Sequence, residues 1–373
     1  MRVDLFYFDQ SFFRKRVCKV LLCTVSVFTC LSAWVAETPA RTKAEVSTLI
    51  DTEGATLPPW WNATKLTYPP TLLLHWERPQ PKEPWTPDKY LGQHIWTTIN
   101  ENPGRWKQGA RLLFHVAELN KDDAAKRVES QKALARIYQY LLQDYARAAY
   151  WWRQAGVEKE DADAALPLAN CFFKLGNKDY PREVLSQIGV DETRHGDVIK
   201  LWADLGEYDK ALAVARQKWQ EDSNPDIGYL MAGETCRLAG RTREAIDFFE
   251  KAMQVDDKKA GRDVKQTKAR AKASIEAVKL YDNFDPRKVA DGTYTADSYG
   301  YSGQVKVGVS VKAGKIDAVK IVSHSEKQYY GALTDTPAKI IQKQSVKGID
   351  AFTGATITSE AIINATAKAL VKE

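Results

Sequence analysis

The chain has 373 residues, a formal net charge of +6 and five cysteines. Its length requires more than one domain. It contains no Cys-x-x-Cys-His motif, no cysteine cluster and no Gly-x-Gly-x-x-Gly after a strand pattern. These absences exclude a c-type haem, an iron–sulfur cluster and a dinucleotide site of the usual kinds. Three cysteines lie before residue 37, and we expect the remaining Cys171 and Cys236 to be buried thiols because they fall on separate helical patterns.

The N-terminal segment has the layout of an export signal. Arg14, Arg16 and Lys19 precede an apolar run at residues 20–36 that ends in small residues. The run is short for a transmembrane helix, which needs roughly 17 to 25 apolar residues. We therefore predict that residues 1–36 are a signal peptide, with an uncleaved signal anchor and hence membrane association as the alternative. The expected location is extracytoplasmic, either periplasmic or at the cell surface, so nucleic acid is not an expected partner.

Residues 37–127 are rich in proline and tryptophan. The densest stretch holds Pro58, Pro59, Trp60, Trp61, Pro69, Pro70, Trp76, Pro79, Pro81, Pro84, Trp85 and Trp96. Prolines at this density prevent long helices and predict extended segments, although one or two helices are expected between residues 91 and 120. Exposed tryptophans would leave a large apolar area in water, so we expect them to pack against the first helical repeat. A carbohydrate- or peptide-binding platform is the alternative.

Residues 128–281 show helical patterns separated by glycine-containing turns. Gly176, Gly206 and Gly240 mark these turns at spacings near the roughly 34 residues of a tetratricopeptide repeat. We predict three to four degenerate repeats that form a short all-α solenoid and dock redox protein partners. An irregular helical bundle is the alternative.

A basic run follows the last repeat. It contains Lys258, Lys259, Arg262, Lys265, Lys268, Arg270 and Lys272. Such a run would attract an acidic redox partner, anionic lipid or a wall polymer. A solvated helix face or a junction between domains explains it equally well.

The C-terminal residues 285–373 predict a small α+β domain. Residues 305–311 and 315–321 alternate β-branched with polar side chains, and Ala313-Gly314 between them is a turn signal, so they predict a β-hairpin. A loop with Tyr330-Gly331 comes next, followed by a short helical pattern at residues 337–343. An apolar helical pattern after Thr358 ends the chain.

The segment between these two helices carries the most specific motif, Asp350-Ala351-Phe352-Thr353-Gly354-Ala355-Thr356. A glycine here lets the backbone turn and approach a phosphate closely, and the following helix N-terminus favours an anion. From about residue 291 to 370 the sequence resembles the FMN-binding domain family, which includes the flavin-carrying subunits of Na⁺-translocating NADH:quinone reductase and Rnf complexes. The motif is similar to the attachment sequence of that family.

The resemblance implies FMN as a covalent cofactor, joined through a phosphoester to Thr356 by a separate FMN transferase. Asp350 would then belong to the sequence that the transferase recognises, or accept hydrogen bonds within the turn. Thr353 and Thr358 would bind the phosphate or cap the helix, with Gly354 and Ala355 forming the turn between them.

The resemblance also suggests side chains around the flavin. The loop at Tyr330 and Gly331 belongs to the expected binding site, and the aromatic candidates to pack on the isoalloxazine are Tyr329, Tyr330 and Phe352. We interpret His324 as a surface residue, with a proton relay to the flavin as the alternative.

Taken together, the sequence predicts an exported electron-transfer flavoprotein rather than a stand-alone enzyme, with no catalytic residue and no metal ligand of its own. One alternative is a flavin-dependent reductase whose substrate binds to the repeat or tryptophan-rich region. Another is a repeat scaffold protein without its cofactor.

Overall fold

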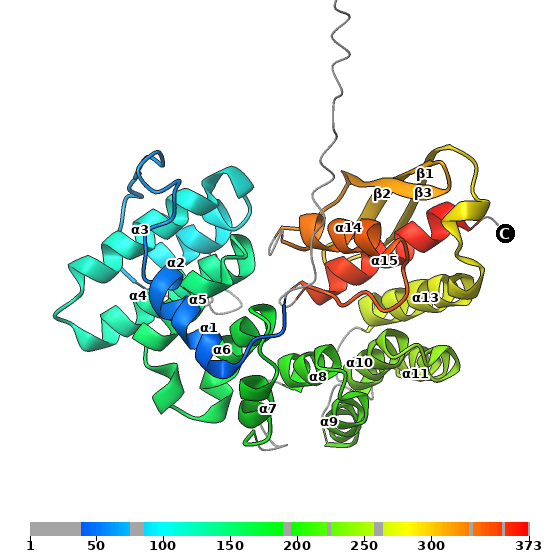
Figure 1. Cartoon of the computed structure of the whole chain (residues 1–373), viewed down its shortest axis with the longest axis horizontal. Coiled ribbons are helices and arrows are strands. Elements are labelled where there is room, and N and C mark those ends of the chain that lie inside the picture. Colours follow the sequence, from blue (N-terminus) through cyan, green and yellow to red (C-terminus); the bar gives the residue numbers. More distant parts are fainter. Residues whose placement is uncertain are drawn as a thin grey trace, which may run out of the picture. The chain divides into compact units, whose positions relative to one another are not determined.

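The computed structural model describes residues 39–74, 86–188, 195–221, 225–256, 264–327, 331–352 and 355–371. The predicted signal segment, Trp76, Trp85, the start of the basic run, Tyr329, Tyr330, Thr353 and Gly354 lie outside these residues. Val35–Glu373 form one compact unit (Figure 1). Across the described residues, the structure contains no helix that is both long and apolar enough to span a membrane.

The N-terminal part of this unit consists of short helices. They are α1 (Lys43–Leu49), the π-helical η1 (Ile50–Gly54), α2 (Leu91–His94), η2 (Ile95–Ile99), η3 (Pro103–Arg105) and α3 (Trp106–Leu119). A capping box starts α1, because Thr42 and Glu45 each accept a hydrogen bond from the other's backbone N–H group. The expected helices between residues 91 and 120 are thus confirmed.

The described tryptophans of the proline-rich segment pack on the helices. Trp61 is buried and meets the Phe114 ring edge-on at 5.1 Å between centroids, and Phe114 in turn meets Trp151 at 5.7 Å. The Arg111 guanidinium lies over the Trp61 ring at 5.4 Å. Trp61 therefore packs on a helix, as expected, but this helix is α3, which precedes the predicted repeats, and not the first repeat.

Helical hairpins follow. Their elements are α4 (Ala124–Arg136) with η4 (Ile137–Leu141), α5 (Tyr145–Gln154), η5 (Val157–Lys159), α6 (Ala162–Lys174), α7 (Asp179–Leu185), α8 (His195–Asp204), α9 (Tyr208–Glu221), α10 (Pro225–Leu238), α11 (Thr242–Gln254) and α13 (Lys265–Leu280). Consecutive helices pack against one another along most of this series.

The predicted glycine turns join these hairpins. Gly176, Gly206 and Gly240 have φ values of 100°, 80° and 74°, a left-handed conformation that a side chain would strain. After each glycine, the next N–H group donates to the carbonyl five residues earlier, as Arg241 does to Cys236 at 2.8 Å. This is the Schellman pattern that ends a helix and reverses the chain. The helix, turn and helix units expected from the sequence are therefore confirmed.

The C-terminal elements are η6 (Tyr281–Asn283), η7 (Pro286–Lys288), β1 (Gly292–Tyr299), β2 (Gln304–Lys312), β3 (Lys315–Ser323), α14 (Ala332–Lys343) and α15 (Thr356–Leu370). The strands form an antiparallel sheet in the order β1-β2-β3. Ala313 and Gly314 have φ values of 49° and 70°, as a two-residue I′ hairpin turn requires. The predicted hairpin is confirmed, and β1 extends the sheet.

Helix α14 begins earlier than the sequence pattern predicted. Pro337 lies inside the helix instead of near its start. The earlier start is fixed by Gly331, whose carbonyl accepts the N–H groups of Thr334 and Asp335 and the Thr334 hydroxyl.

Helix α15 is the centre of the C-terminal core. It packs on β1, β2, α14 and α13, so nearly every residue from Thr358 to Leu370 is buried. One hydrophobic cluster contains Phe249 of α11 and Val278 of α13 together with Val307 of β2 and Ile362 of α15. The core of the C-terminal sheet therefore continues into the last helices of the hairpin series.

Candidate functional site

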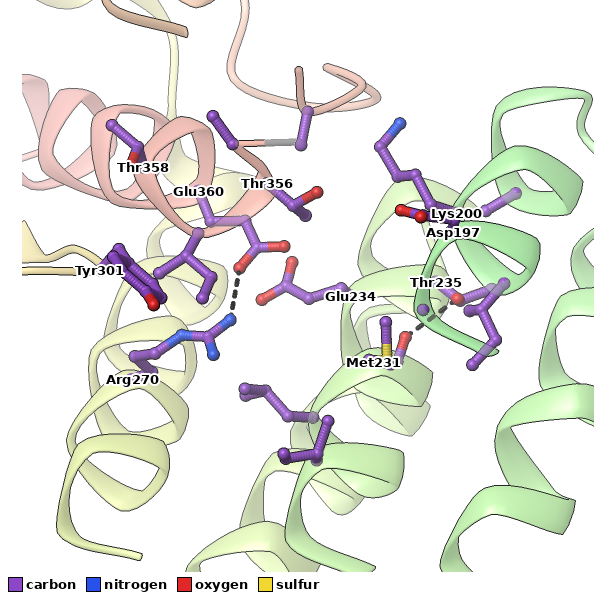
Figure 2. Close-up of a pocket in the computed structure, with 18 of the residues that line it drawn as sticks. Asp197, Lys200, Met231, Glu234, Thr235, Arg270, Tyr301, Thr356, Thr358 and Glu360 are labelled. Atoms are coloured by element: carbon purple, nitrogen blue, oxygen red, sulfur yellow. Dashed lines mark hydrogen bonds and ion pairs between the residues drawn. The ribbon is translucent and has the colours of Figure 1, made fainter. Parts of the chain in front are cut away.

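A pocket of about 560 Å³ lies where the N-terminus of α15 faces helices α8, α10 and α13 (Figure 2). Its apolar lining comes largely from the hairpin helices, with Ile199, Ile227, Leu230 and Met231 among the residues, and Trp96 of η2 also contributes. Thr356, Ile357, Thr358 and Glu360 line it from the α15 side. The predicted attachment residue thus opens into a pocket that neither part of the chain forms alone.

Thr356 is the first residue of α15 and is half-buried. Among the described residues no side chain caps this helix, and the first intrahelical bond runs from the Ser359 N–H to the Ala355 carbonyl at 3.0 Å. The N–H groups before Ser359 consequently have no acceptor within the helix. Together with the helix dipole, these groups favour an anion beside Thr356.

Hydrogen bonds hold the first turn of α15 to two loops. The Thr358 hydroxyl donates to Glu326 Oε2 at 2.6 Å, and Glu326 Oε1 accepts the Ser302 N–H at 3.1 Å. The Phe352 N–H donates to Ser359 Oγ at 2.9 Å. Of the two roles predicted for Thr358, the structure therefore shows neither directly: its hydroxyl is bonded to Glu326. Gly300 allows this contact, since a Cβ there would lie 2.5 Å from Glu326 Oε1.

Asp350 forms ion pairs with two lysines. Its Oδ2 lies 3.0 Å from Lys339 Nζ of α14 and 3.2 Å from Lys174 Nζ at the end of α6. Burial alone would raise the pKa of Asp350, but Lys174, Lys339 and the nearby Lys200 outweigh it and hold the pKa well below its usual range. Asp350 therefore remains a carboxylate, and its pair with Lys174 joins the loop between α14 and α15 to helix α6.

The other predicted site residues fall into two groups. Gly331 and Phe352 pack together and do not line the pocket: Phe352 is 2% exposed, and a Cβ on Gly331 would lie 2.7 Å from its ring. Ala355 packs with Phe352 and also lines the pocket. The Phe352 ring is thus a core residue of the domain. His324 is exposed and does not line the pocket. Tyr330, Thr353 and Gly354 lie outside the described residues, so their predicted roles are untested.

The pocket floor contains a cluster of charged side chains that the sequence did not indicate. Glu360 of α15 and Glu234 of α10 point toward each other (Figure 2), and Arg270 Nη2 of α13 lies 3.3 Å from Glu360 Oε2. Arg237 Nε lies 2.6 Å from Glu234 Oε2. Arg237 is 5% exposed, and its Nη1 has no hydrogen-bond partner in the described residues.

These contacts alter the acidity of Glu360. Burial, followed by the like charge of Glu234, raises its pKa to about 8, and the opposing effects of Arg270 and Arg237 are smaller. Burial and the charge of Glu234 therefore favour the protonated form of Glu360. The floor then holds two guanidinium groups against one carboxylate, which favours negative charge in the pocket.

Lys200 of α8 lines the opposite wall (Figure 2) and pairs with Asp204 one turn later. Burial lowers the pKa of Lys200, and the Asp204 carboxylate only partly opposes this. Neither residue belongs to a motif, so neither could be singled out from the sequence. Arg270 did belong to the predicted basic run, but it turns into the pocket and is not part of a solvated face.

The comparisons with known proteins concern the C-terminal part of the chain. Residues 300–371 match the FMN-binding domain family. A protein of Treponema pallidum (strain Nichols), described as an uncharacterized protein, is 38% identical over 87 residues, which make up 23% of this chain and 24% of the relative. The similarity therefore spans about a quarter of the relative. The match of residues 300–371 to the family supports an FMN-binding domain in this part of the chain, with FMN as its cofactor.

The geometry fits such a cofactor. The pocket volume lies within the roughly 300–1,000 Å³ of small-molecule and cofactor sites, which are mostly apolar with a few placed polar groups. The uncapped start of α15 suits a phosphate, the apolar residues of α8 and α10 suit a flat ring, and Arg237 offers a buried donor without a partner.

Proposed function

We propose that the chain is an exported flavoprotein electron carrier with FMN attached to Thr356 through a phosphoester. The observation that carries this proposal is the position of Thr356, which begins α15 and opens into the pocket of about 560 Å³. The match of residues 300–371 to the FMN-binding domain family supports the identity of the cofactor. When bound, FMN supplies the one- or two-electron chemistry, for which the protein has no other visible group.

The chain's own residues would bind, orient and shield the cofactor. The hydroxyl of Thr356 provides the attachment oxygen, and the unpaired N–H groups of the first turn of α15 neutralise phosphate charge. Ile199, Leu230 and Met231 cover the apolar ring from the side of the hairpin helices. Glu326 holds the first turn in place through Thr358, so the attachment residue is presented at a fixed position.

The experiment is to coexpress the full chain with an FMN transferase and measure flavin fluorescence of the denatured protein on a gel. The wild type should fluoresce and Thr356→Ala should not. Thr366→Ala is the matched control, since this residue lies on the same helix and its hydroxyl bonds only to the Ile362 carbonyl at 2.8 Å. Fluorescence that persists in Thr356→Ala would refute the attachment site.

The proposal includes tetratricopeptide-like repeats as the docking face for redox protein partners. The left-handed glycines at 176, 206 and 240 and the stacked hairpins support a repeat solenoid, which presents a continuous surface. Exchange with a partner protein should slow when exposed side chains of α9 or α11 are replaced, while reduction by a small artificial donor should remain unchanged. Equal slowing of both reactions would contradict a docking role.

The export part of the proposal is supported by the basic and apolar segments before residue 37. The mass of the protein purified from its own host reports signal cleavage and FMN attachment together. An intact N-terminus in a membrane fraction would favour the signal anchor, and a cytoplasmic protein of full length would contradict export.

A second candidate function is a flavin-dependent reductase, favoured by the presence of a defined pocket beside Thr356. In that case a small oxidant would bind beside the flavin, and reoxidation of the reduced protein would saturate with its concentration. Met231→Ala, which enlarges the apolar wall, would then change the KM for this oxidant. A carrier would instead show reoxidation rates that rise linearly with the concentration of any small oxidant.

A further inference from the structure

One buried charged group in the pocket, Glu360, is not needed to attach FMN. Glu360 lies one helical turn after Thr356 on α15, and it is 5% exposed. It contacts Arg270, and it faces Glu234 (Figure 2). A buried acid is costly unless it is paired or neutral, and here two acids share two guanidinium groups at the site where electrons would reside.

We propose that Glu360 is a proton-binding residue of the pocket: in alkaline solution, where it is a carboxylate in the oxidised protein, it takes up a proton when an electron pair enters the pocket and releases it when the pair leaves. The inference rests on the proposed function, because it requires FMN on Thr356. In the reducing step, two electrons would pass from a reduced redox protein to the bound FMN, and one proton from solvent, in addition to those that the flavin itself binds, forms an O–H bond on the Glu360 carboxylate. Oxidation returns the electrons to an acceptor and the proton to solvent, so no other bond of the protein changes.

The charges around Glu360 decide the sign of this coupling. They come from every element that faces it: Glu234 and Arg237 of α10, Arg270 of α13, Tyr281 after α13, Glu326 after β3, and Asp197 and Lys200 of α8 across the pocket. Lys200 is paired with Asp204, and β2 packs buried valines against α15. Protonated Glu360 thus leaves the floor with an excess of guanidinium charge over carboxylate charge, which stabilises added electrons.

Arg237 gives an independent indication that the floor is built to receive negative charge. Its Nε is paired with Glu234, but its buried Nη1 has no partner in the described residues. A buried charged donor without an acceptor is unusual, and each such group requires an explanation. Negative charge added to the pocket on reduction would interact with this guanidinium. Deprotonated Glu360 would be a competing negative charge.

The main experiment is a redox titration of the flavinylated full-length protein from pH 6 to pH 10. For the wild type, the equilibrium constant for reduction should fall by an additional factor of ten per pH unit above about pH 8, which is the pKa of Glu360 in the oxidised protein. For a two-electron couple this is about 30 mV per pH unit. Glu360→Gln should lack the additional slope. Glu276→Gln is the matched control, because Glu276 of α13 is exposed and pairs with Lys368 of α15.

Two further variants keep Glu360 in place and should shift the pH at which the additional slope begins, here called the break, in opposite directions. Arg270→Gln removes a charge that lowers the pKa of Glu360, so the break should move to higher pH. Glu234→Gln removes a charge that raises this pKa, so the break should move to lower pH. A break that stays in place in both variants would overturn the assignment to Glu360.

The apo protein provides a readout that does not depend on flavin. In full-length Thr356→Ala protein, infrared difference spectra should show a carboxyl that titrates near pH 8 and is absent when Glu360→Gln is added. If the reduction potentials of the wild type and Glu360→Gln, with flavin attached in both, vary with pH in parallel, proton coupling would be refuted and the proposed function would stay intact. Loss of covalent flavin from the wild type would instead refute the proposed function itself.

Discussion

Asp350→Asn distinguishes a structural role from a recognition role for the acidic residue of the attachment motif. In the structure, Asp350 Oδ2 pairs with Lys339 Nζ at 3.0 Å and with Lys174 Nζ at 3.2 Å. The substitution keeps the size of the side chain but removes its charge. Lys174 is then left partly buried without its closest carboxylate, so we expect the attachment loop to be held less firmly to α6.

The magnitude follows from the exposure of the pair. The side chain of Lys174 is 13% exposed and that of Asp350 is 31% exposed, so the pair lies between the buried and surface limits. Breaking a buried pair costs about 3–5 kcal/mol, and an exposed pair contributes about 0–1 kcal/mol. We therefore expect Asp350→Asn to lower the free energy of unfolding by about 1–3 kcal/mol.

The pH dependence has a defined sign. Because the folded-state pKa of Asp350 is lowered, its contribution to stability is present above the unfolded-state value of 3.8 and is lost as the pH falls further. The wild type should thus lose more stability than Asp350→Asn when the pH is lowered from about 4 toward 2.

The assay is urea unfolding at pH 7 for Asp350→Asn, Lys174→Met and the double variant, with covalent flavin measured on the same samples. A structural pair predicts a coupling energy of about 0.5–3 kcal/mol in the double-mutant cycle. Additive effects would refute the ion-pair reasoning. Loss of flavinylation in Asp350→Asn without any loss of stability would show that the residue serves the transferase alone.

Three further predictions concern the same part of the chain. Gly331→Ala should lower the free energy of unfolding in urea by about 1–3 kcal/mol through overpacking, because its Cβ would lie 2.7 Å from the Phe352 ring. Gly104→Ala is the control and should leave this free energy unchanged, because nothing lies within 4 Å of its Cβ. In the apo protein, the pKa of Glu360 is raised from 4.5 to about 8, so its stabilising effect is full below pH 4.5 and is lost as the pH rises toward 8, by at most about 5 kcal/mol. Glu360→Gln should flatten this part of the stability curve, and an unchanged curve would refute the burial argument. Finally, residues 265–373 should form a more stable fragment than residues 285–373, as measured by urea unfolding, because the first fragment keeps α13 against α15; equal stabilities would show that the C-terminal core is self-contained.

Local chemistry explains which parts of the fold could be predicted from sequence. The turn at Ala313-Gly314 and the turns at Gly206 and Gly240 require left-handed backbone, so glycine marks them directly. The alternation in β2 and β3 identifies a sheet face in the same way. The start of α14 was predicted at residue 337, whereas the helix begins at Ala332, where the Gly331 carbonyl accepts a hydrogen bond from the Thr334 hydroxyl.

The pocket could not be predicted because it depends on contacts between distant segments. The sequence identified Thr356, but nothing local indicates that Glu234 faces Glu360 or that Lys174 reaches Asp350. The ambiguity of Thr358 had the same origin, since its partner Glu326 lies in a loop that precedes α14. A side chain's role in this domain is decided by which helix covers it.

The hairpin helices therefore do more than extend the chain. Arg270 and Glu234 belong to α13 and α10, and they contact or face Glu360 on the helix that carries Thr356. The residues that bury α15 against the hairpins thus also determine the charge of the pocket floor. If FMN resides there, substitutions on α10 or α13 that leave the Thr356 hydroxyl untouched will change both the stability of the C-terminal core and the reduction potential of the flavin. A freely tethered flavin domain would not link these two properties.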